Sequence, residues 1–142
     1  MSYFDFSEEV RKAVDAAPDR ASRLSAKTSV YREQFPSAVR RAGFNLIDRD
    51  SHFEPGDNDL VVGVAPWSDS DLAVLESLAL QSHALGVRVS VLDIDNLMLP
   101  GMREKIPGFR IFLYTPVVFH YRDGKLAYFG EGRDALLWLR EL

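Results

Sequence analysis

The stretch that decides the fold is LVVGVAPWSDSD, residues 60–71. Its first six residues are apolar and predict a buried strand over 60–65. The polar residues that follow Trp67 are typical helix caps, and the spacing of apolar residues predicts a helix over 70–85 that Gly86 ends. Trp67 is therefore expected in an exposed turn between a buried strand and the start of a helix.

Strands and helices alternate on both sides of this stretch. Before it the sequence predicts a helix over 6–17, a polar turn over 18–28, a helix around 29–42 with Pro36 at its first turn or at a kink, a strand over 44–48 and a loop over 49–59. After it the sequence predicts a strand over 87–93, a connector over 96–109 with room for one short helix, a hairpin of strands 116–122 and 125–130 turned by Asp123-Gly124, and a last helix over 132–142. This order predicts an α/β protein with a mixed sheet.

Three segments resemble the thioredoxin-like superfamily. Ser68 and Asp71 take the places of the two cysteines in the Trp-Cys-x-x-Cys turn of that family, after Trp67. Thr115-Pro116 then opens an apolar strand at the usual separation from the tryptophan, and residues 91–95 resemble the third strand of the family. The resemblance implies a thioredoxin-like fold, a central mixed β-sheet flanked by helices, and a cis bond before Pro116 that faces the Trp67 turn.

The resemblance covers roughly residues 60–142. We expect a thioredoxin-like domain over 44–142 and a helical N-terminal extension over 1–43 that packs on its core.

Thiol–disulfide exchange requires a thiolate, and the chain has no cysteine to supply one. The buried acid that assists thiol chemistry in the family is replaced by Val62. We therefore expect no catalytic residue, no cofactor and no disulfide oxidoreductase activity, so the chain would be a redox-inactive member.

Composition restricts the partners. The 142 residues are 46% hydrophobic and 27% charged, as in one soluble globular domain, and the net charge of −4 argues against nucleic acid. No apolar stretch is long enough for a bilayer, and residues 1–9 lack the features of a signal peptide. We expect no membrane partner and a cytoplasmic protein of bacterial type.

Two other kinds of site are weaker interpretations. Asp93 and Asp95 share one strand face and could approach Asp69 and Asp71 as ligands for a hard cation, but a solvated rim with helix caps explains them as well, and we expect no metal. Ser68 could act as a nucleophile or simply cap the helix after it, and no histidine is spaced to serve it as a base.

Three functions stay open. The leading one is a non-catalytic module that binds a protein or peptide partner in a groove formed by Trp67, Ser68, Asp71, Thr115 and Pro116. An alternative is a glutathione-binding enzyme in which Ser68 replaces the thioredoxin cysteine. The third is a structural or homodimeric protein whose groove is filled by its own residues 1–28.

Overall fold

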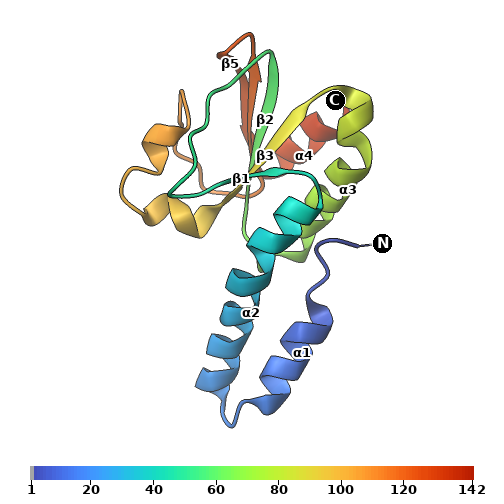
Figure 1. Ribbon diagram of the computed structural model, residues 1–142, viewed down its shortest axis with the longest axis vertical. Helices are drawn as coiled ribbons and strands as arrows, with labels where there is room; N and C mark the ends of the chain where they lie inside the picture. The colour runs from blue at the N-terminus through green and yellow to red at the C-terminus, as the bar shows by residue number, and fades with distance from the viewer. Residues whose placement is uncertain (1) are drawn as a thin grey trace.

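The computed structural model describes residues 2–142, which build one mixed sheet with helices stacked on it (Figure 1). The strands are β1 (Asn45–Ile47), β2 (Asn58–Val64), β3 (Arg88–Asp93), β4 (Val117–Arg122) and β5 (Lys125–Glu131). The helices are α1 (Ser7–Ala16), α2 (Arg20–Arg41), α3 (Asp69–Leu85) and α4 (Gly132–Arg140), with two short 3-10 helices, η1 (Ile94–Met98) and η2 (Arg103–Lys105). The predicted α/β class is confirmed.

The strand order in the sheet is β1-β3-β2-β4-β5. β3 pairs in parallel with both β1 and β2, whereas β4 is antiparallel to β2 and β5 is antiparallel to β4. β2 is thus paired along both edges, and its residues 59–64 are all buried. A strand covered on both faces needs a nearly continuous apolar run, which is the pattern that the sequence shows over 60–65.

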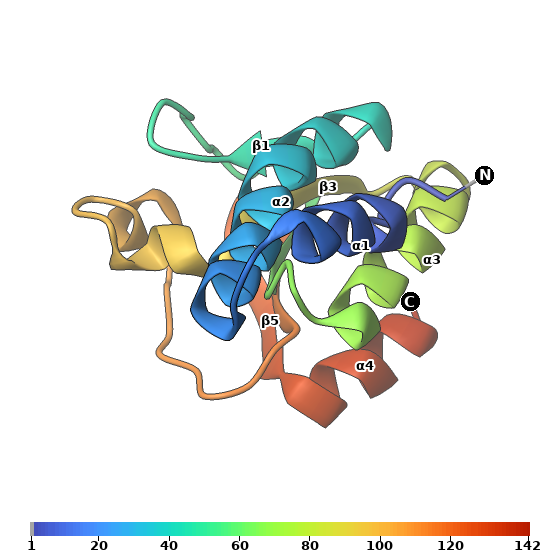
Figure 2. The same ribbon diagram turned by 90° about the horizontal axis from the view of Figure 1, so that it is seen from below.

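The two faces of the sheet are covered differently. The α-helices supply one hydrophobic core, in which Phe35, Leu75 and Ala135 meet Val62 of β2. The opposite face is covered by the connector between β3 and β4, whose Met102 and Ile106 pack with Val61 and Phe119. Figure 2 shows the 3-10 helices projecting on one side of the sheet and α1, α3 and α4 on the other.

The N-terminal part of the chain contributes directly to the first core. Phe4 and Phe6 are buried beside Phe35, and Phe4 stacks with Phe44 at 6.4 Å between ring centroids. The segment before α1 and the C-terminal part of α2 thus contribute to this core, while the extension over 1–43 and the domain over 44–142 stay a prediction.

Two predicted elements differ from the structure. The polar turn over 18–28 is wrong, because α2 begins at Arg20 and Pro36 lies inside it. Asp19 caps this helix by accepting a hydrogen bond from Ser22 N at 2.8 Å, and the following residues are mostly good helix formers. The connector holds two short 3-10 helices, where one short helix was predicted.

None of the helices in residues 2–142 is both long enough and apolar enough to cross a bilayer.

One ion pair fixes the loop before β2. Arg88 Nη2 donates to the buried Asp59 Oδ2 at 2.8 Å and to the carbonyl oxygen of Glu54 at 2.9 Å. Asp59 also accepts a hydrogen bond from Gly56 N. The loop is thereby joined to the first residue of β3.

Replacing Arg88 should therefore weaken the fold. We expect Arg88→Met to lower the free energy of unfolding by about 1–3 kcal/mol, because it leaves the Asp59 carboxylate buried without its charged partner. Chemical denaturation measures the change, with Arg133→Met, at an exposed position of α4, as the control. Equal stability of the two variants would contradict the role given to the ion pair.

Candidate functional site

The predicted site residues lie at one edge of the sheet, which we call the site edge. β2 ends at Val64 just before the Trp67 turn, and Pro116 directly precedes β4. Gly63 pairs with Val117 and Val64 pairs with Asp93, so both segments and the end of β3 leave the sheet together. The structure thus brings together the Trp67 turn, Thr115-Pro116 and Asp93.

Ser68 is the N-cap of α3. Its Oγ accepts a hydrogen bond from Asp71 N at 3.3 Å and lies 3.2 Å from Ser70 Oγ. His120, a potential base, is bonded through Nε2 to Asn58 Oδ1 at 2.8 Å, at the opposite end of β2. The capping interpretation of Ser68 is confirmed, and His120 is placed too far along the sheet to activate its hydroxyl.

Asp71 is buried, with 2% of its surface exposed. Its Oδ2 accepts a hydrogen bond from Ala65 N at 2.9 Å, which joins the first turn of α3 to the end of β2. A carboxylate in the first turn of a helix is also favoured by the helix dipole. Asp71 therefore has a structural role under the site edge, and its side chain does not form part of the exposed surface.

Trp67 and Thr115 are the parts of the site edge that a partner could reach. Trp67 is 46% exposed, and the Thr115–Pro116 bond is cis, as the resemblance predicted. The carbonyl oxygen of Pro116 accepts a hydrogen bond from Gly132 N at 2.9 Å. Within residues 2–142, by contrast, the backbone N–H and C=O of Thr115 make no hydrogen bond.

The segment before Thr115 is apolar and exposed. Ile111, Leu113 and Tyr114 are among the most exposed large hydrophobic side chains of the chain. Glu131 Oε1 holds this segment in place by accepting hydrogen bonds from Leu113 N at 2.9 Å and Tyr114 N at 3.3 Å. Residue type alone does not distinguish these exposed side chains from the aliphatic and aromatic residues that fill the core.

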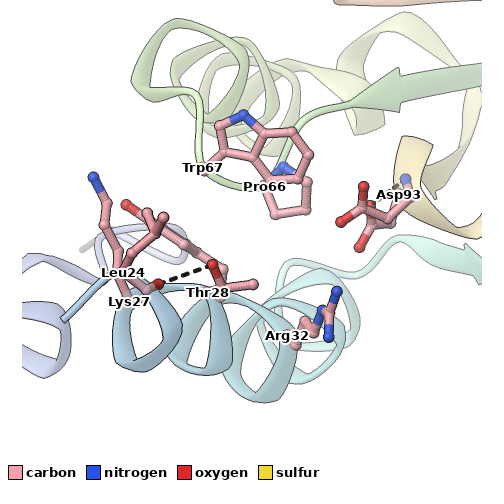
Figure 3. A pocket seen from close by; sticks show the side chains of 9 residues that line it. Leu24, Lys27, Thr28, Arg32, Pro66, Trp67 and Asp93 are labelled. Carbon is pink, nitrogen blue, oxygen red and sulfur yellow. Dashed lines mark hydrogen bonds between the residues drawn. The ribbon is translucent and has the colours of Figure 1, made fainter. Parts of the chain in front are cut away.

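A cavity of about 360 Å³ lies between α2 and the Trp67 turn (Figure 3). Its lining residues come from α2, from the turn, from the carboxyl end of β3 and from η1: Leu24, Lys27, Thr28, Tyr31, Arg32, Pro66, Trp67, Asp93 and Asp95. Sequence reasoning missed this cavity because it assigned Leu24, Lys27 and Thr28 to a turn.

Asp93 carries the most perturbed carboxyl group of the cavity. Burial raises its pKa to about 6, and the charge of Asp95 adds to the rise. A hydrogen bond from Asp95 N, 2.9 Å from Asp93 Oδ1, and the charge of Arg32 oppose it. Strongly shifted groups in a cavity are typical of functional sites, although structural groups also show such shifts.

The acidic residues do not assemble into a metal site. Within residues 2–142, no three histidine, aspartate or glutamate side chains lie close enough together to hold an ion. Asp93 caps η1 by accepting the hydrogen bond from Asp95 N.

The mixed five-stranded sheet with its four α-helices is the architecture that the resemblance to the thioredoxin-like superfamily implies. The fold is thioredoxin-like. The chain is thus a cysteine-less protein with this fold, as the three resembling segments predicted.

Comparisons with known proteins give structural neighbours but no sequence family. No protein-family model matches the chain, and no curated protein sequence matches it either. It is similar to Chlamydomonas reinhardtii thioredoxin f2 at 19% identity, over 68% of this chain and 93% of that chain, with a TM-score of 0.48. It is also similar, at 17% identity, to a chain from a structure on thiol resolution in yeast mitochondrial 1-Cys peroxiredoxin via glutathione/thioredoxin systems. That match covers 70% of this chain and 95% of the other, with a TM-score of 0.46.

Asp93 gives a testable dependence of stability on pH. Its pKa of about 6 exceeds the ordinary 3.8, so the folded state binds the proton more tightly than the unfolded chain does. The cost of ionising this carboxyl therefore grows as pH rises from about 4 through 6 and is complete above that range.

We expect Asp93→Asn to raise the free energy of unfolding at pH 8 by on the order of 1 kcal/mol, after allowance for screening by solvent, and to change it little at pH 4. Asparagine keeps an oxygen that can accept from Asp95 N. Denaturation at both pH values measures the effect, with Asp50→Asn in the exposed loop before β2 as the control. A loss of stability at pH 8 would show that ionised Asp93 stabilises the fold.

Proposed function

We propose that this protein binds an extended segment of a protein partner at the site edge and performs no chemistry on it. The observation that carries the proposal is the free backbone of Thr115 at the same edge of the sheet as the exposed ring of Trp67. Within residues 2–142 the N–H and C=O of Thr115 have no hydrogen-bond partner, so both can pair with the backbone of another chain. Such pairing accepts any sequence, and neighbouring side chains supply specificity.

The surroundings of Thr115 suit a protein partner. Trp67 offers a large aromatic surface, and tryptophan is among the residues that contribute most to binding at protein interfaces. Leu113 and Tyr114 extend the apolar surface along the chain before Thr115. Glu131 anchors the backbone of this segment, so a partner would meet a surface that is already ordered.

The two residues at the cysteine positions of the resembling family, Ser68 and Asp71, support binding without catalysis. No thiolate can form in a chain without cysteine, and Ser68 uses its oxygen to cap α3. Asp71 is buried and bonded to Ala65. The alternative, a glutathione-binding enzyme that uses Ser68, is tested by titrating glutathione while the Ser68 amide signal is followed by NMR; saturable binding would favour the enzyme.

A selection of random peptides on the full chain tests the proposal. We expect selected peptides to shift the NMR signal of the Thr115 amide, and Trp67→Ala to weaken their binding about tenfold or more, because tryptophan anchors typically dominate such interfaces. Isothermal titration measures the affinities. Leu80→Ala removes an equally apolar but distant exposed side chain on α3 and should leave binding nearly unchanged.

Circular dichroism confirms that both variants fold. Peptides that bind Trp67→Ala as tightly as the unchanged chain, or the absence of any enriched peptide, would contradict the proposed function.

A further inference from the structure

The cavity beside Trp67 has a chemical character of its own. Most of its surface is apolar, with Leu24 and Tyr31 of α2 on one side and Pro66 and Trp67 of the turn on the other. In Figure 3, Leu24 and Lys27 lie at one end, and Asp93 lies at the other end, near Arg32. A guest must therefore present an apolar body and one polar tip.

The sign of the charge on that tip follows from burial. Lys27, Arg32 and Asp95 are exposed, so solvent screens their charges, whereas Asp93 is half-buried. Charges interact more strongly where water is excluded, so Asp93 dominates the field inside the cavity. No ion pair joins Asp93 to any cation within residues 2–142, although Arg32 lies on the facing helix.

We propose that this cavity receives a lysine or arginine side chain of the partner segment, a step that rests on the proposed function. The aliphatic stem would pack against Leu24 and Pro66, and the cation would lie near the Trp67 ring and the Asp93 carboxylate. A cation over the face of a tryptophan is an established favourable contact, and long basic side chains readily bury their stems in this way. The net charge of −4 on the whole chain adds attraction for a basic partner.

The proposal has a defined dependence on pH. Burial raises the pKa of Asp93 to about 6, and a cationic guest would oppose that rise by favouring the ionised carboxylate. Affinity should therefore increase as pH rises through about 6. The other charged or titratable groups that face the cavity are Lys27, Tyr31 and Arg32 on α2 and Asp95 on η1. The pKa of Tyr31 is raised above 10, so it stays neutral in this range.

A small probe tests the cavity without an extended segment. The probe is N-acetyl-arginine methylamide, and its matched control is the citrulline analogue, which has nearly the same shape without the charge. Binding is followed through the indole N–H signal of Trp67 in NMR spectra, assigned as the signal lost in Trp67→Ala. We expect the arginine probe to shift this signal saturably at pH 8 and the citrulline control to bind at least fivefold more weakly.

Two substitutions should act in opposite directions. Asp93→Asn removes the carboxylate and should weaken the arginine probe about fivefold, the size expected for a partly exposed charge pair. Arg32→Gln removes a competing cation and should strengthen binding of the arginine probe, because the charge of Arg32 repels a cationic guest. Asp50→Asn removes the same charge outside the cavity, so it is the matched control and should leave the affinity for the arginine probe unchanged.

Equal binding of the arginine and citrulline probes, no binding of either, or tighter binding to Asp93→Asn would overturn the proposal. Weaker binding to Arg32→Gln would also overturn it, because that result indicates an anionic guest. Selected peptides without a basic residue, combined with an unbound probe, would reject this inference and leave the proposed function intact. If the arginine probe binds but the peptide selection enriches no peptide, the preference of the cavity for a basic side chain is supported and the binding of an extended partner segment is rejected.

Discussion

The pairing of β2 along both of its edges is the interaction on which the rest of the structure depends. Its parallel register with β3 places Val64 beside Asp93, and its antiparallel register with β4 places Gly63 beside Val117. The second register requires glycine, because a Cβ at position 63 would lie 2.4 Å from Val117 Cγ1. Since the strands are fixed in this way, the Trp67 turn and Thr115 emerge together, and the site needs no loop of unusual length to bring them into one surface.

The unequal covering of the two sheet faces creates the second part of the site. α2, α3 and α4 pack on one face, α1 packs against α2, and α2 continues well beyond the sheet, as Figure 1 shows. Only the C-terminal part of α2 is buried, at Phe35, Ala38 and Val39. Its N-terminal part is therefore free to face the Trp67 turn, and the cavity lies between them. A thioredoxin-like sheet thus acquires one wall of a cavity from residues that precede its first strand.

Local signals were the predictable ones. Asp123-Gly124 predicted the hairpin correctly, and both residues have the positive φ angles that such a turn requires, 52° and 79°. The cap at Ser68 was likewise predicted from residue type and spacing. The start of α2 was missed because residues 18–28 are mostly polar, and their helix is stabilised by the cap at Asp19 and by packing against α1. The cavity was missed for the same reason, since it depends on where that helix lies in space.

The two carboxylates under the site edge show how the same residue type takes different roles. Asp71 is buried at the start of α3, where the helix dipole and the N–H of Ala65 both stabilise a negative charge. Asp93 lies at the end of a strand, where no helix of two turns or more begins. Within residues 2–142, the one backbone N–H that donates to its carboxylate is that of Asp95. Its charge is therefore less well compensated than that of Asp71, although Asp93 is only half-buried and Asp71 is fully buried. A cation from a partner would compensate the negative charge of Asp93. At Asp71 the fold already compensates the charge, so a cation would add little there.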